Sequence, residues 1–365
     1  AYFVGAVITK SLELPGKPVP LMMDFVSVLA NYLDDDVILT HLAELENAGV
    51  YEWRSEEAAR VAKTLVGKDC GRSPSNRGAF KRAVKNRPFE SIEKLLERTL
   101  LDPSSSAGGS AHQRFKFAIN RVFCLIGSKL NWCCLDKFLR KQFELPEAQH
   151  TFISFNYDLV LDRAIQKQGG SAWEVSSGYG FPIPYYVQED LPKTAAGAGP
   201  LDYVPALQFP SPTAPPGRLR ALKPHGSLNW LVPFKLPYEP TKVGIATEDA
   251  PVVIPLTASG ALRYWCSTLD SQHVQCPGKD PHEVGVCILP PSSAKRSGLS
   301  FLESIRHQEI QALRDADEIY VLGWSMPETD TDQECLIRSA VRDRRESIGQ
   351  VTAVSRGASP EYFRR

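Results

Sequence analysis

The chain has 365 residues, which is enough for two domains or for one large domain with insertions around a substantial core. Lys plus Arg and Asp plus Glu number 42 each, so the formal net charge of zero excludes a global positive field that would attract nucleic acid or an anionic membrane. The 8 cysteines lack the spacing of a disulfide framework, no apolar run approaches the roughly 20 residues that span a bilayer, and the sequence shows no signal peptide, so we expect a cytoplasmic protein without a membrane partner.

The chain opens with a predicted strand and a polar loop. Apolar residues run from Ala1 into Gly5, and a polar stretch begins at Thr9. Residues 21–33 then carry apolar side chains at three- and four-residue spacing, which predicts an amphipathic helix. A glycine-bearing loop between a first strand and a first helix can bring backbone N–H groups close to a pyrophosphate, although one such loop has little specificity. Ala1 is not a methionine, and what precedes it is left open.

Residues 36–149 are predicted to form a helical insertion between the first and second core strands. Apolar residues recur at helical spacing from Phe89 to Leu100 and from Phe115 to Ile126. A basic cluster between Arg72 and Arg87 lacks a run of interleaved aromatic residues, so a solvated loop is favoured over contact with nucleic acid.

The segment 151–168 changes character at Asn156. β-branched and aromatic residues precede it, which predicts a buried strand, and apolar residues at helical spacing follow Asp158. Asn156 and Asp158 would therefore lie where the carboxyl end of a strand meets the amino end of a helix, which is where ligands bind in open α/β sheets. The alternative is purely local, with Asn156 as a turn residue and Asp158 as a helix cap.

Residues 171–283 are predicted to form a loop-rich insertion, interrupted by a core segment around His225. The stretch 169–220 is rich in Pro, Gly, Tyr and Ala, which is typical of a functional lid or a partly disordered loop. His225 is followed at once by a glycine, so the backbone can pass close to a ligand there. A structural histidine is the alternative, since a lone histidine is more often structural than catalytic.

Cysteine and histidine residues gather between residues 266 and 287. Their spacing lacks the close CxxC pair that identifies a zinc site, so reduced, partly buried thiols are favoured over a bound metal, and no metal-binding residue is assigned. The residues concerned are Cys266, His273, Cys276, His282 and Cys287.

The last part of the chain alternates strands and helices. Strands are predicted at 286–289, 318–322 and 351–354, and helices at 301–314 and 331–342. This alternation predicts an α/β fold with a Rossmann-like, doubly wound parallel sheet, in which the loops at the strand ends converge on one crevice. We expect a single domain whose core comprises residues 1–35, 150–170, 218–232 and 284–365.

Four loop segments carry a resemblance to a known family. They are Gly5-Ala-Val-Ile-Thr9, Phe155-Asn-Tyr-Asp158, Lys223-Pro-His-Gly-Ser-Leu-Asn-Trp230 and Gly323-Trp-Ser-Met-Pro-Glu-Thr-Asp330. In this order they resemble the Gly-Ala-Gly-x-Ser loop, the Thr-Asn-Tyr-Asp turn, the histidine loop and the Gly-x-Ser loop of the sirtuin-like NAD-consuming family, particularly of its prokaryotic antiphage branch. Four ordered motifs are far more specific than any one of them.

The resemblance implies a Rossmann-like site for NAD+ as substrate and hydrolysis of the bond to nicotinamide, with NAD+ depletion serving antiviral defence. Asn156 would hold the ribose and the attacking water, His225 would act as the base, and Asp158 would help to fix the nicotinamide amide. The resemblance places the pyrophosphate against Gly5, Ala6 and Thr9, and the adenosine side against Gly323, Ser325 and Ser355.

Two residues depart from the family's pattern. Val7 stands at the family's third-position glycine, where its branched side chain either shifts the loop or partly fills the pyrophosphate subsite, and Phe155 replaces Thr before the asparagine. A catalytically impaired sensor that binds NAD+ or ADP-ribose is therefore the alternative function. Protein deacylation is less favoured because the sequence lacks a tandem CxxC zinc ribbon. A homo-oligomer or an activating partner protein is left open.

Overall fold

A five-stranded parallel sheet holds the strands from which the four loops emerge. The computed structural model describes residues 1–6, 8–9, 12, 133–145, 147–187, 194–195, 202–210, 217–233, 251–254, 256, 272–288, 300–324, 331–344 and 348–354. The sheet has the order β13-β12-β1-β2-β7, and every neighbouring pair is parallel. This sheet confirms the predicted α/β class, and its order is compatible with a Rossmann-like arrangement. Its strands are β1 (Tyr2–Val4), β2 (His150–Ser154), β7 (Leu219–Leu222), β12 (Glu318–Leu322) and β13 (Gln350–Val354).

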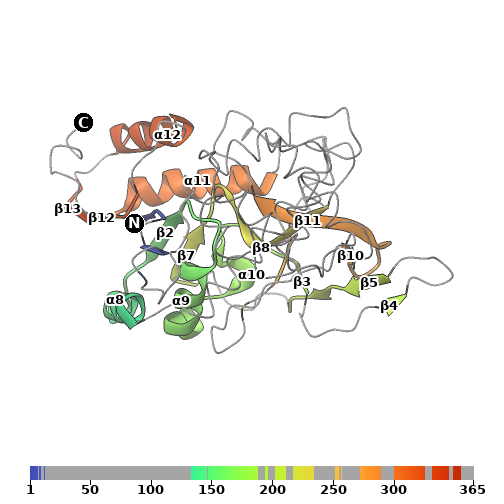
Figure 1. The fold of residues 1–365 in the computed structure, drawn as a ribbon. Helices are drawn as coiled ribbons and strands as arrows, with labels where there is room; N and C mark the ends of the chain where they lie inside the picture. Colours follow the sequence, from blue (N-terminus) through green and yellow to red (C-terminus); the bar gives the residue numbers. More distant parts are fainter. Residues whose placement is uncertain are drawn as a thin grey trace, which may run out of the picture.

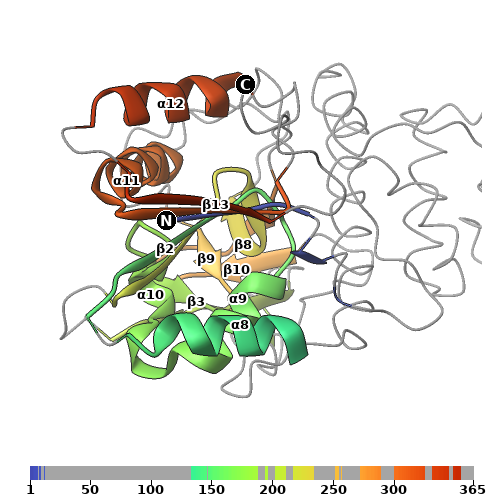
Figure 2. The same cartoon turned by 90° about the vertical axis from the view of Figure 1, so that its left-hand side faces the viewer.

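Helices cover both faces of this sheet. In Figures 1 and 2, α11 (Ser300–Asp315) and α12 (Thr331–Arg342) lie on one side, and α8 (Cys133–Phe143) and α9 (Val160–Gly169) lie on the other. The sequence places α9, α11 and α12 within one or two residues of these bounds. Because both faces are covered, the central strands are apolar runs without alternation, and β1 is buried along its whole length.

Aromatic pairs set the register at the centre of the sheet. Tyr2 of β1 lies opposite Phe152 of β2 and Tyr320 of β12, and its ring stacks on theirs at centroid distances of 4.5 Å and 5.0 Å. The same register places Val4 opposite both Ser154 and Leu322. The three strands therefore end level with one another.

A second, eight-stranded mixed sheet has the order β4-β5-β10-β11-β8-β9-β3-β6. Its two long strands, β8 (Gly226–Pro233) and β11 (His282–Ile288), pair antiparallel, with a bulge or irregularity between Val286 and Cys287. The short strands are β3 (Tyr185–Tyr186), β4 (Thr194–Ala195), β5 (Asp202–Pro205), β6 (Leu207–Gln208), β9 (Val252–Val253) and β10 (Gln272–Gln275). A turn of 3-10 helix (Gly170–Ala172) and the short helix α10 (Val175–Gly178) lead into this sheet from α9.

The second sheet departs from the sequence prediction in two respects. Short strands occupy part of the segment 171–283, which the sequence predicts to be loop-rich, because runs of two to four residues among prolines and glycines are too short to show a period of two. In addition, β8 and β11 fall in segments that the sequence assigns to the parallel core, yet they pair with each other. A strand's own residues do not identify its partner.

Several predicted features lie outside the described residues. They include the helix at 21–33, most of the helical insertion at 36–149, the basic cluster at 72–87 and Val7. The last helix of that insertion is α8, which an ion pair between Asp136 and Arg163 of α9 (2.9 Å) joins to the core. Among the helices within the described ranges, none is both long and apolar enough to cross a membrane.

Gly5 lies at a point where two backbone segments touch. A Cβ atom added to Gly5 would lie 2.5 Å from the carbonyl oxygen of Gly323 and 2.5 Å from the Cα atom of Trp324. Backbone atoms cannot rotate away as a flexible side chain can, so the absence of a side chain at Gly5 is a packing requirement.

We expect Gly5→Ala to lower the free energy of unfolding by about 2 kcal/mol or more, because the chain after β12 must move. Thermal and chemical denaturation measure the change. Gly278→Ala is the matched control: Gly278 has a φ of +74° in a turn but open space around its Cα atom, so only the backbone strain of about 1 kcal/mol applies. Equal losses in the two variants would contradict the steric argument.

Candidate active site

The predicted site residues converge at the carboxyl edge of the parallel sheet. Gly5 follows β1 and donates its N–H to Leu322 of β12 (3.0 Å), while Phe155 follows β2 and donates its N–H to Val4 of β1 (3.0 Å). Gly323, with a φ of +64°, follows β12 and donates its N–H to Val354 of β13 (2.9 Å). Because the strands are parallel and end level, the loops after them meet at one edge.

Asn156 connects the loop after β2 to the loop after β1. Its side-chain Nδ2 atom donates to the carbonyl oxygen of Gly5 (3.2 Å) and to the hydroxyl oxygen of Thr9 (3.5 Å). Its backbone N–H donates to the hydroxyl oxygen of Ser154 (3.4 Å), which closes the turn at the end of β2. Asn156 is partly exposed, and these hydrogen bonds fix the orientation of its amide.

Asp158 is buried and accepts two hydrogen bonds. Thr9 donates its hydroxyl to the Oδ2 atom (2.9 Å), and the backbone N–H of Val160, the first residue of α9, donates to the Oδ1 atom (2.9 Å). Asp158 thus contacts the start of α9, whose N-cap position is Leu159 and has no side-chain cap. Burial raises the pKa of Asp158 above its ordinary value, and the Lys223 ammonium group and the two hydrogen bonds partly oppose that shift.

His225 lies in a turn that packs on both neighbours of Asn156. The N–H of Gly226 donates to the carbonyl oxygen of Lys223 (3.0 Å), and a φ of +84° at Gly226 redirects the chain into β8. The His225 ring contacts Phe155 edge to face at 5.5 Å and Tyr157 at 6.2 Å between ring centroids. His225 is only 3% exposed. The fold thus holds this ring beside the Asn156 turn.

Phe155 also joins the Asn156 turn to the loop after β12. Its ring stacks on Trp324 at 4.4 Å and 13°, and Trp324 stacks in turn on Phe3 of β1 at 5.3 Å. The phenylalanine that departs from the family's threonine is therefore part of an aromatic layer that reaches His225 on its other side.

Several of the predicted site residues lie close to one another. Gly5, Thr9, Asn156 and Asp158 form one set of hydrogen-bonded neighbours, with His225 packed beside it. Ala6 is partly exposed next to Gly5. Ser325 and Ser355 follow Trp324 and Val354 directly but lie outside the described residues.

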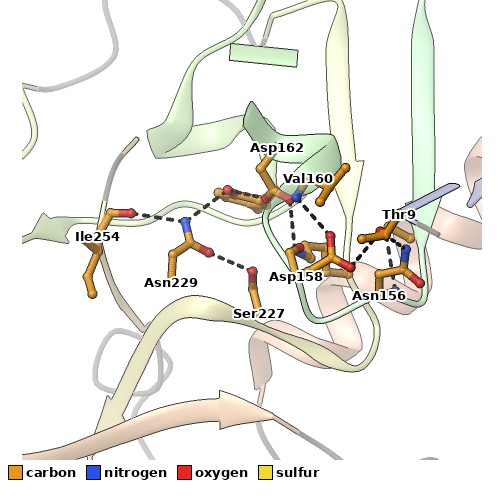
Figure 3. A network of polar contacts seen from close by, with 11 residues as sticks. Thr9, Asn156, Asp158, Val160, Asp162, Ser227, Asn229 and Ile254 are labelled. Atoms are coloured by element: carbon orange, nitrogen blue, oxygen red, sulfur yellow. Dashed lines mark hydrogen bonds and ion pairs between the residues drawn. The ribbon is translucent and has the colours of Figure 1, made fainter. Parts of the chain in front are cut away.

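A buried polar network behind the site was not anticipated. Lys223 donates to the carbonyl oxygen of Asp158 (2.7 Å) and pairs with Asp162 (3.0 Å), which also accepts the hydroxyl of Tyr179 (2.7 Å). Asn229 donates its Nδ2 atom to the Tyr179 oxygen (3.2 Å) and to the carbonyl oxygen of Ile254 (3.2 Å). Figure 3 shows this network extending from Thr9 and Asn156 to Asn229, whose Oδ1 atom accepts the hydroxyl of Ser227 (2.7 Å).

Two signals in the sequence point to this network. Asp162 lies one helical turn after Asp158, which places both carboxylates on one face of α9 and its first turn. Lys223 and Asn229 lie within the segment that contains His225. Burial and the neighbouring Asp162 carboxylate raise the pKa of Tyr179 well above its usual value, so this hydroxyl stays protonated and donates.

The cysteine- and histidine-bearing segment shows separate thiols. Cys276 and Cys287 are buried and form no disulfide, and burial raises the pKa of the Cys276 thiol. Within the described residues, no group of three or more His, Cys, Asp or Glu side chains is arranged to hold a metal ion. Cys266 and the side chain of His282 lie outside them.

No protein-family model matches the sequence, and no curated protein matches it.

The raised pKa of Asp158 leads to a pH-dependent prediction for Asp158→Asn. A carboxyl group with a raised pKa in the folded state contributes stability that is fully present below its unfolded pKa of about 3.8 and is lost as the pH rises through the folded pKa. The difference in melting temperature, variant minus wild type, should therefore shift in favour of Asp158→Asn as the pH rises from about 4 to about 7.

Thermal melts at a series of pH values measure this difference. Glu147→Gln is the control, because it removes the carboxylate of an exposed residue. If the melting temperature of Asp158→Asn instead falls relative to wild type as the pH rises, hydrogen bonding rather than burial determines the pKa of Asp158.

Proposed function

We propose that the protein is an NAD+ glycohydrolase that converts NAD+ and water into nicotinamide, ADP-ribose and a proton. The observation that carries the proposal is the grouping of Asn156, Thr9, Asp158 and His225, from three separate loops, at one edge of a parallel sheet. The resemblance to the sirtuin-like NAD-consuming family requires this grouping, and a doubly wound, Rossmann-like core would provide it. Antiphage defence through NAD+ depletion is the corresponding biological role.

The reaction needs groups that stabilise a positive charge on the ribose and groups that activate water. As the bond from the ribose C1′ atom to the nicotinamide nitrogen breaks, the bonding electrons leave with the nitrogen and the ribose becomes an oxocarbenium-like cation. The Asn156 amide would hold the ribose and the water that adds to C1′, and the His225 imidazole would accept the proton. Asp158 would orient the nicotinamide amide, and the Gly5 and Gly323 loops would hold the pyrophosphate and the adenosine.

A sensor that binds NAD+ or ADP-ribose without cleaving it is the second candidate. Two observations favour it: His225 is 3% exposed between two aromatic rings, and the Asn156 amide already donates to Gly5 and Thr9. A base has to reach the proton that it removes, so hydrolysis requires these side chains to become accessible when the substrate binds. Binding of NAD+ without release of nicotinamide would identify the sensor.

We expect purified protein to bind NAD+ and to release nicotinamide, and Asn156→Ala to reduce turnover by on the order of 10²-fold or more while the fold is kept, because Asn156 is partly exposed. Calorimetry with NAD+ and ADP-ribose and chromatography of the products provide the measurements.

Asn229→Ala is the matched control for this loss. It removes a fully buried asparagine amide, so it should lower the melting temperature more and turnover less than Asn156→Ala does. No binding and no turnover by the wild type, in any oligomeric state, would refute both candidate functions.

His225→Gln tests the proposed base. Glutamine approximates the volume of histidine in this packed position but cannot accept a proton, so turnover should fall by roughly 10²-fold or more with little change in ADP-ribose affinity. Paired measurements of kcat and of ADP-ribose affinity separate the two effects. Full activity of His225→Gln would assign the base to another residue.

A further inference from the structure

Two consecutive carbonyl groups of the Asn156 turn accept hydrogen bonds from the loop that carries His225. The backbone N–H of Leu228 donates to the carbonyl oxygen of Tyr157 (3.1 Å), and the Nζ atom of Lys223 donates to the carbonyl oxygen of Asp158 (2.7 Å). These donors lie on either side of His225 in the sequence. The histidine loop is therefore attached to the Asn156 turn before and after the histidine itself.

The attachment by Lys223 is made by a fully buried charge. Lys223 is 0% exposed, and its ammonium group lies 3.0 Å from the Oδ2 atom of Asp162, whose side chain is 1% exposed. Burial of an ammonium group costs free energy unless nearby acceptors replace its hydration. Asp162 and the Asp158 carbonyl oxygen provide them, which fixes the ammonium group in one place.

From this geometry we infer that Lys223 is a positioning residue for the proposed hydrolysis: through the carbonyl oxygen of Asp158 it sets the separation between Asn156 and His225. The inference rests on the proposed function. Lys223 does not touch the reacting atoms. It ties the turn that carries Asn156 to the loop that carries His225, and displacement of one reacting group by about 1 Å can slow a reaction on the order of 10²-fold.

A merely structural lysine would behave differently from a positioning one. In that case Lys223 would serve only to neutralise Asp162, and removing both charges together would restore stability and activity alike. If Lys223 positions the turn, the same double change removes its bond to the carbonyl oxygen of Asp158. Stability is then restored, but activity is not. The Asp162→Asn background therefore isolates the bond from Lys223 to the carbonyl oxygen of Asp158.

The test compares Asp162→Asn with the double variant Lys223→Met/Asp162→Asn, because methionine keeps the length of the side chain and removes the ammonium group. Lys223→Met leaves Asp162 without its cation and Asp162→Asn leaves Lys223 without its carboxylate, so both single variants should lose stability and wild type is the second reference. Tyr179→Phe is the control, since it removes a hydroxyl from the network without touching the bond to Asp158. For each protein we measure the melting temperature, kcat and KM for NAD+, and hydrogen exchange of the Val160 and Leu228 amides.

The double variant should melt no lower than Asp162→Asn, since a buried ammonium group without its carboxylate is removed. Its kcat should nevertheless fall by on the order of 10²-fold relative to Asp162→Asn, with a smaller change in KM. The Leu228 and Val160 amides should exchange at least about 10-fold faster, while amides of β1 and β12 keep their rates. Tyr179→Phe should lose stability and keep its kcat.

Equal kcat values and equal exchange rates in the double variant and in Asp162→Asn would overturn the inference and leave Lys223 as the counter-ion of Asp162. That result, with wild type that hydrolyses NAD+, leaves the proposed function intact. Wild type that neither binds nor hydrolyses NAD+ contradicts the proposed function, and the inference about hydrolysis falls with it. The two failures are thus distinguishable by the wild-type measurement alone.

Discussion

The buried ammonium group of Lys223 is the constraint on which the arrangement of the site depends. A charge without contact to water requires acceptors at short distance, and here they come from the turn after β2 and from the first turns of α9. Helix α9 must therefore dock with its amino end against the end of β7. The positions of the Asn156 turn, the start of α9 and the histidine loop are therefore coupled, because all three surround the buried ammonium group of Lys223.

The same network extends from the parallel sheet into the second sheet. Hydrogen bonds join Asp162 on α9 to Tyr179, which follows α10, and Tyr179 to Asn229 on β8. Asn229 also donates a hydrogen bond to the carbonyl oxygen of Ile254 beside β9. A polar network in a core stabilises a fold only when its members are satisfied together, so a shift of the second sheet would disturb the Asn156 turn. The buried aromatic layer of Phe3, Trp324 and Phe155 packs against that turn as well.

Local patterns in the sequence predicted local structure well and tertiary partners poorly. The strand before Asn156, the helix after Asp158 and the alternation from 300 to 354 follow from periodicity and turn chemistry within short windows. The family resemblance assigns Asn156, Thr9 and His225 to one site, and in the structure Asn156 contacts Thr9 while His225 packs on the two neighbours of Asn156. The burial of Lys223 and Asp162, by contrast, was not predicted: their positions near His225 and Asp158 are visible in the sequence, but only a partner far along the chain makes burial of either charge favourable. The pairing of β8 with β11 was missed for the same reason.

The place of β1 at the centre of the parallel sheet has a consequence for how the chain folds. Tyr2 pairs with Tyr320, so the contact that completes the sheet closes a loop of nearly the whole chain, and such distant pairings form slowly because chain entropy is lost before the contacts form. During synthesis, β2 can cover one edge of the Tyr-Phe-Val strand early, whereas its other edge stays open until β12 has left the ribosome. An apolar strand with an open edge is a template for pairing with another chain, which makes the nascent protein most vulnerable before its last strands appear.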